Sequence, residues 1–332
     1  MTNPLRVGVI GVGKMGADHA DRVTSSLGGA VLAAVADPDT TTAEQLATAY
    51  GVRAFADPLA LIADEDVDAV IIASPGFVHE EQLLACIDAG KYALCEKPLT
   101  MDAESSRRVV EAERAGGTPL IQVGFMRRFD PEYLEMKRHI DDDDFGRLLL
   151  VHNVHRNKAV PTDFLSEMAV RDSLVHEVDT VRWLFGQEIT EITVHSPAPS
   201  SLAHDGMVDP QIAIFKMAGG GMVTNEVFVN CQVGYEVRCE ATLEHGSLTV
   251  GLGGGTLIRS QNRWGGSIPD DFRVRFADAY DREVQSWVGA TRRGEVVGPT
   301  AWDGLASTVV CTAGMESLAS GRPVSVSLPE VE

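Results

Sequence analysis

The sequence predicts an α/β fold for the amino-terminal part of the chain, with a doubly wound parallel sheet. It predicts an α+β fold with a large, open, mostly antiparallel sheet for the rest. Strand-like and helix-like segments alternate through residues 1–125, as in repeated βαβ units. From residue 126 onward the segments are mostly strand-like and closely spaced. A chain of 332 residues also favours two domains over one.

The elements of the first part follow from hydrophobic runs and the helical patterns between them. A buried strand is expected at 6–11 and a helix at about 15–26. Further strands are expected at 30–37, 67–74, 91–96 and 120–125, and further helices at 41–50, 79–90 and 102–116. Continuous apolar runs are typical of parallel strands, because helices cover both faces of such a sheet.

The elements of the second part begin with a helix at 167–185. Strands are expected at 188–196, 210–217, 221–230 and 235–244, and two carboxyl-terminal helices at 278–293 and 300–317. Strands separated by short turns indicate antiparallel pairing, with helices packed on one side of the sheet. The four aspartates at 141–144 are interpreted as a solvated turn.

The composition excludes some classes of partner. The net charge is −20 and the sequence pI is about 4.8, so no basic surface is expected for nucleic acid or anionic membranes. No apolar run approaches the length of a membrane span, and the run at 7–12 lacks the basic leader of a signal peptide. Five cysteines without a CxxC pair indicate reduced thiols, as in a cytoplasmic protein.

A GxGxxG motif follows the first strand and opens the first helix; it consists of Gly11, Val12, Gly13, Lys14, Met15 and Gly16. In a dinucleotide-binding fold, Gly11 permits the tight turn and Gly13 lets a pyrophosphate approach the backbone. Gly16 lets the helix pack closely on the strand. The amino terminus of the helix favours an anion. We therefore expect a bound dinucleotide here.

An acidic residue indicates which dinucleotide is preferred. Asp37 ends the second strand, 21 residues after Gly16, where a carboxylate can accept hydrogen bonds from the adenosine ribose. Pro38 follows, and no arginine stands beside it to bind a 2′-phosphate. The expected cofactor is therefore NAD rather than NADP.

A second candidate motif, Cys95-Glu96-Lys97-Pro98, lies at the carboxyl end of a predicted parallel strand. Ligands of open α/β sheets bind at this edge. A lysine in such a loop is often only solvent-facing. Beside bound NAD, however, the ammonium of Lys97 could hydrogen-bond a substrate hydroxyl and stabilise oxyanion character as hydride leaves.

A polar stripe marks the helix at 167–185. At about 100° per residue, Asp172, His176 and Asp179 fall on one side of this helix. The apolar residues of the opposite side are Val170, Leu174, Val178, Val181 and Phe185. Periodicity alone favours a solvated face of an amphipathic helix. A metal site and a catalytic site are the alternatives.

The order of these motifs resembles the Gfo/Idh/MocA oxidoreductase family: GxGxxG, then Glu-Lys-Pro, then a helix with Asp-x3-His. The segment GFMRRFD at 124–130 resembles the inositol 2-dehydrogenase branch of that family. Other segments that do so are His155-Arg156-Asn157, VNC at 229–231 with Gly234-Tyr235, AYD at 279–281 and GPTAWDG at 298–304. The resemblance runs over nearly the whole chain.

The resemblance implies a Rossmann NAD-binding domain at 1–125 and a substrate-binding and oligomerisation domain at 126–332. It places Lys97, Asp172 and His176 at the catalytic centre. The residues expected to bind NAD are Gly11, Val12, Gly13, Lys14, Met15, Gly16, Asp37, Ser74, Pro75, His79, Glu96, Lys97, Met126 and Arg127. The residues expected to bind substrate are Lys97, His155, Asn157, Asp172, His176, Asp179 and Tyr235. A homotetramer built through the open sheet faces is also implied.

With the resemblance included, catalysis becomes the favoured interpretation of the polar stripe. His176 would act as general base, with a neighbouring carboxylate fixing its tautomer. No metal is expected, because Lys97 can supply the positive charge that hydride transfer needs. His19 lies in an ordinary helix, and no function is expected for it.

The implied activity is the NAD-dependent oxidation of a secondary hydroxyl on a cyclic polyol. Myo-inositol, oxidised to 2-keto-myo-inositol, is the first expectation; another inositol isomer or a pyranose sugar is the alternative. The chain has Ser74-Pro75-Gly76-Phe77 where the inositol enzymes carry SWGP, in a loop that borders the nicotinamide. A non-catalytic NAD-binding regulator and an NAD-dependent glycosidase also stay open.

Overall fold

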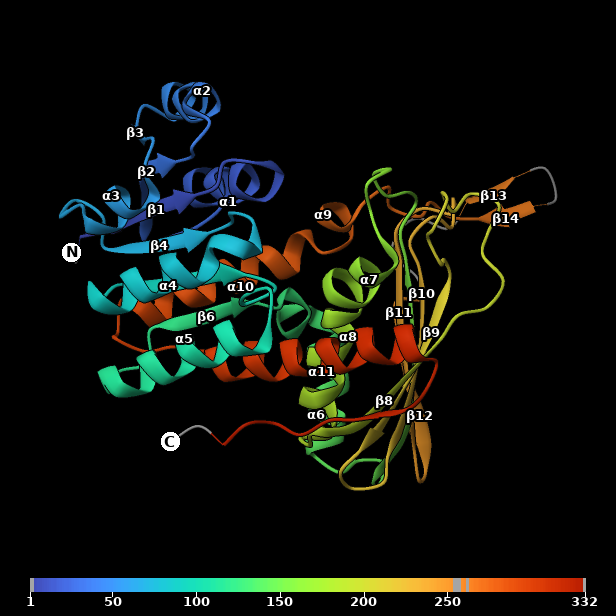
Figure 1. Cartoon of the computed structure of the whole chain (residues 1–332). Helices are drawn as coiled ribbons and strands as arrows, with labels where there is room; N and C mark the ends of the chain where they lie inside the picture. The colour runs from blue at the N-terminus through green and yellow to red at the C-terminus, as the bar shows by residue number, and fades with distance from the viewer. Residues whose placement is uncertain (1–2, 253–257, 261–262, 331–332) are drawn as a thin grey trace. The chain divides into compact units, whose positions relative to one another are not determined.

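The computed structural model describes residues 3–252, 258–260 and 263–330, which form two compact units (Figure 1). The first unit comprises Met1–Met126, Tyr280–Thr308 and Pro329–Glu332. The second comprises Arg127–Ala279 and Val309–Leu328. Each unit has its own sheet.

The first unit contains a six-stranded parallel sheet. Its strands are β1 (Leu5–Ile10), β2 (Ala30–Ala36), β3 (Arg53–Phe55), β4 (Ala69–Ile72), β5 (Tyr92–Glu96) and β6 (Ile121–Gly124). The strand order is β3-β2-β1-β4-β5-β6, and every pair is parallel. The order reverses between β1 and β4, so the prediction of a doubly wound sheet is confirmed.

Helices cover this sheet. They are α1 (Lys14–Ser25), α2 (Thr40–Tyr50), α3 (Pro58–Ala63), the short η1 (Gly76–Val78), α4 (His79–Asp88) and α5 (Ala103–Gly116). The short elements β3 and α3 are not among those expected from the sequence. The start of α3 nevertheless has a local cause, because the Asp57 side chain accepts from the Leu59 N–H and Pro58 occupies the first turn.

The carboxyl-terminal helices were expected only as elements of the second part. In the structure, both helices pass from one unit to the other. Helix α10 (Ala277–Thr291) begins in the second unit and ends in the first, and helix α11 (Ala301–Ser320) begins in the first unit and ends in the second. Val284, Trp287 and Val288 of α10 belong to the same buried apolar cluster as β1 and β2. A distant segment of the chain therefore completes the core of the parallel sheet.

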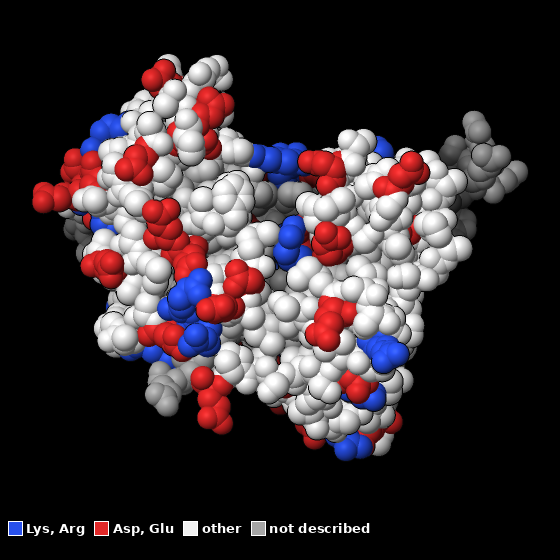
Figure 2. All heavy atoms as spheres, in the orientation of Figure 1, with Lys and Arg blue, Asp and Glu red and all other residues white. Residues whose placement is uncertain are grey.

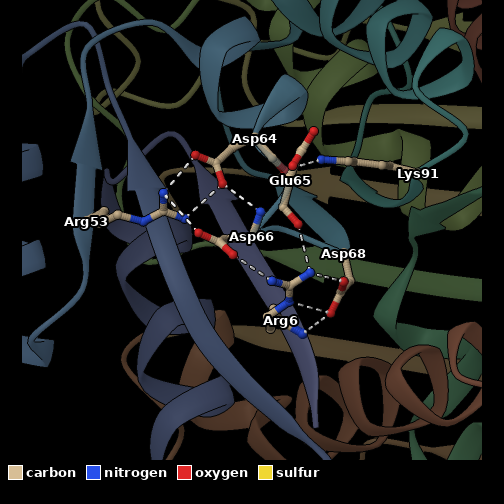
Figure 3. Close-up of polar contacts among 7 residues, drawn as sticks. All are labelled: Arg6, Arg53, Asp64, Glu65, Asp66, Asp68 and Lys91. Carbon is tan, nitrogen blue, oxygen red and sulfur yellow. Dashed lines mark hydrogen bonds and ion pairs between the residues drawn. The ribbon is translucent and has the colours of Figure 1, made fainter. Parts of the chain in front are cut away.

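The amino ends of the strands are held by surface ion pairs (Figure 3). Arg6 of β1 donates to both carboxylate oxygens of Asp68, at 3.1 and 2.7 Å, and to Asp66 at 2.9 Å. Arg53 of β3 donates to both oxygens of Asp64, at 2.8 and 2.9 Å. Most of these groups are partly exposed, and ion pairs in contact with solvent contribute little stability. The opposite edge, at the carboxyl ends of the strands, carries the candidate motifs.

The second unit contains a seven-stranded mixed sheet. Its strands are β7 (Leu148–Arg156), β8 (Ile189–His195), β9 (Gln211–Met217), β10 (Met222–Phe228), β11 (Glu236–Leu243), β12 (Gly246–Val250) and β15 (Val324–Ser325). The order is β12-β11-β7-β10-β9-β8-β15. Only β7 and β10 pair in parallel among these strands, so the expectation of a mostly antiparallel sheet is confirmed.

The remaining elements are mostly helical. They are η2 (Met126–Phe129), α6 (Pro131–Asp141), α7 (Ser166–Met168), the π-helical η3 (Ala169–Leu174), α8 (Val175–Phe185) and α9 (Phe272–Arg275), with a small β13–β14 pair (Ile258–Ser260 and Arg263–Gly265). Helices α6, α8 and η3 contact the seven-stranded sheet and lie on one side of it (Figure 1). The sequence reasoning missed α6 and the interior strand β7.

The predicted regular helix at 167–185 is wrong in one respect. Residues 169–174 form a π-helical segment between α7 and α8, and Asp172 lies within it. A π segment closes i→i+5 hydrogen bonds, so it inserts a residue into the helical register, and such segments often occur at functional sites. Amphipathic periodicity does not reveal it, because the segment is continuous with helix on both sides.

Neither unit shows a helix that could cross a bilayer within the described ranges. Acidic side chains are spread over the face shown in Figure 2, with basic side chains in small groups among them. This distribution reflects the net charge of −20.

Candidate active site

The glycine motif lies between β1 and α1, as expected. Gly11 has φ +81°, and a Cβ there would lie 2.5 Å from the Ser74 nitrogen. A Cβ on Gly16 would lie 1.6 Å from the Gly11 oxygen, so the helix packs directly on the turn. A Cβ on Gly13 would meet no atom within 4 Å. Since Gly13 precedes Lys14 and has no side chain to cap the helix, the first-turn N–H groups suit a phosphate.

Asp37 lies beside this loop. Its carboxylate accepts a hydrogen bond from the Val12 N–H at 2.9 Å and one from the Asp39 N–H at 2.9 Å. The residue follows β2, at the same sheet edge as the glycine motif. The side chain is therefore held where a ribose diol would lie, next to a dinucleotide on the glycine loop.

The loop after β4 also reaches this edge. The hydroxyl of Ser74 donates to Gln82 Oε1 at 2.7 Å, and Pro75 precedes the short helix η1. Phe77 in η1 is 75% exposed. A Cβ on Gly76 would lie 3.4 Å from Pro98 Cγ, so this loop also adjoins the Lys97 loop.

Lys97 follows the last residue of β5, at the carboxyl edge of the sheet. Its neighbour Glu96 is buried and lies 2.9 Å from Nε2 of His19. His79, the first residue of α4, is 1% exposed; its Nδ1 lies 3.0 Å from the Pro98 oxygen. His79 was expected to bind the cofactor. Both of its ring nitrogens lie within hydrogen-bond distance of backbone carbonyl oxygens, and its cofactor role stays a prediction.

Several predicted substrate residues gather at one edge of the second unit's sheet. Because β7 and β10 are parallel, Arg156 and Phe228 end both strands at the same edge. Asn157 continues from β7 and donates its N–H to the Phe228 oxygen at 3.0 Å. Tyr235 immediately precedes β11, which is antiparallel to β7 and starts at this edge.

Two of these residues are polar groups that suit a hydroxylated ligand. Asn157 Oδ1 is buried and has no hydrogen-bond partner within the described parts of the chain. Buried polar atoms normally have a partner, so a ligand hydroxyl would satisfy this one. Burial raises the pKa of Tyr235 to about 12, so its phenol stays protonated near neutral pH.

His155 lies between two of the other candidates. The ring centroids of His155 and Tyr235 are 5.8 Å apart, and those of His155 and His176 are 6.2 Å apart. His155 Nδ1 lies 3.1 Å from Glu177 Oε2. If Nδ1 carries the hydrogen and donates it to this carboxylate, Nε2 is left as an acceptor.

Behind His155 lies a buried ion pair between Arg127 and Glu177. Arg127 is 1% exposed and Glu177 is fully buried. Burial opposes ionisation of Glu177, but the charge of Arg127 and the contacts with His155 outweigh it and lower the pKa of Glu177 to about 2. The guanidinium of Arg127, expected near the nicotinamide, is thus engaged by Glu177; its cofactor role stays a prediction.

The polar stripe of the 167–185 helix does not form a solvated face. His176 is 7% exposed and Asp179 is 1% exposed. Asp179 accepts two hydrogen bonds from Arg128, at 3.0 and 2.6 Å. Asp172 is partly exposed and accepts two from Arg171, both at 2.8 Å. Both carboxylates near His176 therefore have an arginine partner.

The predicted catalytic residues are divided between the units: Lys97 belongs to the first, and Asp172 and His176 to the second. Met126 ends the first segment of the first unit, and Arg127 begins the second unit. Within the described residues, no group of three or more His, Cys, Asp or Glu is arranged to hold a metal ion.

The sequence reasoning missed three residues of these clusters: Glu177, Arg128 and His19. Glu177 follows the predicted base directly, and a glutamate amid the apolar residues of a buried helix was the available signal. Arg128 lies in the GFMRRFD segment but received no role. Nothing local distinguishes His19, whose partner Glu96 is 77 residues away.

The chain was compared with known families, proteins and structures. Residues 5–125 match the profile of the Gfo/Idh/MocA oxidoreductase family with an NAD-binding Rossmann fold. Residues 133–249 match the profile of a Gfo/Idh/MocA carboxyl-terminal domain. Residues 5–125, which contain the glycine motif and Asp37, are therefore an NAD-binding Rossmann domain.

Curated relatives match over nearly the full length. The chain is 53% identical over 329 residues to inositol 2-dehydrogenase 1 of Mycolicibacterium vanbaalenii, covering 97% of this chain and 96% of the relative. It is 51% identical over 335 residues to inositol 2-dehydrogenase of Mycolicibacterium smegmatis, covering 98% and 97%.

A solved structure is similar as a whole. Myo-inositol dehydrogenase from Lactobacillus casei, in complex with NAD(H) and myo-inositol, matches with a TM-score of 0.95 and 34% identity. The alignment covers 99% of this chain and 98% of that one. The glycine loop, the Lys97 loop and the matches over both halves of the chain lead to one conclusion: this protein belongs to the Gfo/Idh/MocA oxidoreductase family.

Proposed function

We propose that this protein oxidises a secondary hydroxyl of a cyclic polyol, with myo-inositol converted to 2-keto-myo-inositol. The observation that carries the proposal is the full-length match, at 53% identity, to a protein named inositol 2-dehydrogenase. Bound NAD would accept the hydride from the carbinol carbon. Another inositol isomer or a pyranose sugar is the second candidate, because the chain has SPGF at 74–77 where the resemblance to inositol enzymes implies SWGP.

The proposal assigns the reaction chemistry to three residues. Lys97, at the carboxyl edge of the parallel sheet, donates to the hydroxyl oxygen and stabilises its developing negative charge. His176 takes the hydroxyl proton as general base, and Asp172 orients the imidazole of His176. Asp172 lies in the π segment directly before the helix that carries His176, which supports a paired role.

Recognition of the remaining hydroxyls is assigned to His155, Asn157, Asp179 and Tyr235. The short ring distances around His155 and the buried, unsatisfied Oδ1 of Asn157 support this assignment. We also propose that residues 1–125 serve NAD binding and that residues 126–332 serve substrate binding and assembly.

The test is to incubate the protein with NAD and a panel of inositols and pyranose sugars while NADH absorbance is followed. We expect NADH to accumulate in proportion to polyol consumed, with myo-inositol among the substrates. A glycosidase that uses transient oxidation would consume a glycoside without net NADH. A regulator would bind NAD and turn over nothing.

Lys97→Ala is the matched variant for this assay. We expect it to retain NAD binding, measured by calorimetry, and to lose turnover, because its ammonium acts on the hydroxyl oxygen. A Lys97→Ala enzyme that oxidises inositol at nearly the wild-type rate would show that Lys97 is only a solvent-facing loop residue.

We further propose a cytoplasmic homotetramer. The five cysteines lie as free thiols, and Cys86, Cys95, Cys239 and Cys311 are buried, which supports a reducing compartment. The sheet face opposite α6 and α8 carries Leu150 and Met222, which are in register on β7 and β10 and are 39% and 41% exposed. Exposed apolar side chains on an open sheet suit an interface between copies.

A further inference from the structure

Both chain neighbours of Lys97 contact a buried histidine. Glu96, on the amino side, lies against His19 of α1, and Pro98, on the carboxyl side, lies against His79 of α4. Both histidines belong to the first unit, and their rings are 0% and 1% exposed. Two separate helices of one unit therefore engage the loop on either side of a single lysine.

The contact between His19 and Glu96 has a clear direction. His19 Nε2 lies 2.9 Å from Glu96 Oε1. His19 Nδ1 has no hydrogen-bond partner among the described residues, so the hydrogen belongs on Nε2, which donates to the carboxylate. Gly124 provides the space, since a Cβ there would lie 3.2 Å from Glu96 Oε2.

The ring of His79 bridges two loops. Its Nε2 lies 2.8 Å from the Ser74 oxygen, and its Nδ1 lies 3.0 Å from the Pro98 oxygen. The sulfur of Cys95 is 3.4 Å from Nδ1, and its thiol donates to the Glu96 oxygen at 3.3 Å. Each ring nitrogen thus faces a backbone carbonyl: a hydrogen on Nδ1 would be donated to Pro98, and a hydrogen on Nε2 would be donated to Ser74.

These contacts constrain the backbone from which Lys97 extends. A lysine side chain has a flexible four-carbon stem, so its ammonium is placed only as well as its backbone is held. A displacement of about 1 Å at a reacting group can cost about 100-fold in rate. Anchors on residues 96 and 98 restrict the backbone on both sides of residue 97.

We propose that His19 and His79 are positioning residues for Lys97, acting through the Glu96 carboxylate and the Pro98 carbonyl. The inference rests on the role proposed for Lys97 in polyol oxidation. His19 also links this loop to α1, the helix that opens with the glycine motif, so one helix serves both the phosphate site and the lysine.

The two positions allow a crossed pair of conservative variants. The amide nitrogen of Asn lies where Nδ1 of histidine lies, and that of Gln lies where Nε2 lies. His79→Asn therefore places a donor beside the Pro98 oxygen, whereas His79→Gln places it beside the Ser74 oxygen. At His19 the order reverses: His19→Gln keeps a donor for Glu96, and His19→Asn loses it.

The first measurement reads Lys97 directly and needs no substrate. The chain has six lysines, so reductive methylation with 13C gives a sparse NMR spectrum, in which Lys97 is assigned by its loss in Lys97→Ala. We expect the Lys97 signal to shift or broaden in His79→Gln and His19→Asn. It should stay in place in His79→Asn and His19→Gln.

The second measurement is the steady-state oxidation of the polyol. We expect His79→Gln and His19→Asn to lower kcat about 10- to 100-fold, with little change in the KM for NAD. At each position the donor-keeping variant should retain a clearly higher kcat than the donor-losing variant. Melting temperatures of all four variants are measured in parallel.

A response that follows side-chain size at both positions, or that tracks the melting temperature, would show a packing role and overturn the proposal. An unmoved Lys97 signal in both donor-losing variants would also overturn it. If these variants do not fold, the NMR measurement is repeated on Gly124→Ala, whose Cβ would press on the Glu96 carboxylate at 3.2 Å while both histidines stay unchanged. A Lys97 signal that does not move in this variant would overturn the proposal. A crossed NMR pattern in a protein that oxidises no polyol would uphold the positioning and refute the proposed function.

Discussion

Asp37 shows how a single carboxylate can select a cofactor. It accepts from the Val12 and Asp39 N–H groups at 2.9 Å each, so its charge is held beside the glycine loop. A 2′-phosphate at the same place would meet that charge, whereas a ribose diol could donate to it.

The first prediction concerns this discrimination. We expect kcat/KM with NAD to exceed that with NADP at least about tenfold, or about 1.4 kcal/mol. Asp37→Asn keeps an acceptor oxygen for Val12 but removes the charge, so the preference should shrink. Equal kcat/KM for both cofactors in the wild type would contradict the role of Asp37.

The second prediction concerns His176 as general base. The ring nitrogen of His176 that accepts the hydroxyl proton must be unprotonated before turnover, so kcat/KM should rise with pH. His176→Ala should lose this limb and lower kcat by about 10²- to 10⁴-fold. NAD affinity serves as the control. A variant within about threefold of wild type, with the same pH profile, would exclude this role.

At the scale of elements, one buried cluster joins three segments of the second unit. Arg127 comes from η2, His155 from β7 and Glu177 from α8. Buried charges are costly when a partner is lost, so the three segments hold one another in place. Since His176 is adjacent to Glu177, this cluster also fixes the start of the helix that carries the proposed base.

The third prediction follows from the low pKa of Glu177. That pKa is about 2 in the folded protein, below about 4.3 in an unfolded chain, so the ionised carboxylate stabilises the fold above pH 4.3. This stabilisation is lost as the pH falls from about 4.3 toward 2. Glu177→Gln should cost about 3–5 kcal/mol at pH 7, because Arg127 stays buried and unpaired.

Thermal unfolding between pH 7 and pH 3 measures this difference. The gap between wild type and Glu177→Gln should narrow on the acid side. Glu104→Gln is the control, because the Glu104 side chain is 75% exposed and should change little at any pH. A gap that is constant with pH would show that folding does not lower the pKa of Glu177.

At the scale of the whole molecule, the open sheet face predicts assembly. We expect Met222→Glu to shift the protein to smaller species in light scattering, because it places a charge on the proposed interface. Val31→Glu is the matched control: Val31 is also 41% exposed but lies on β2 of the first unit. An unchanged mass for Met222→Glu would place the interface elsewhere.

Much of the first unit could be predicted because its signals are local. Alternating apolar runs and helical patterns define the parallel sheet, and Gly11, Gly16 and Asp37 occur at the spacing that a dinucleotide loop needs. The elements β3, α3, α6 and β7 were missed although some have local capping signals. The strand β3 and the helix α3, with three and six residues, carry too little periodicity to be recognised. The helix α6 and the strand β7, with eleven and nine residues, were missed although they are long enough to show a pattern.

The sequence by itself determined the class of fold, the cofactor edge and the residue types of the candidate site, because these depend on patterns within a few tens of residues. Tertiary structure decided the partners of those residues. Three such pairings join segments that are far apart in the chain. They are His19 with Glu96, Glu177 with Arg127 and His155, and α10 with the parallel sheet. Such partners are chosen by burial, since a charged or polar group removed from water must find a partner wherever the fold brings one.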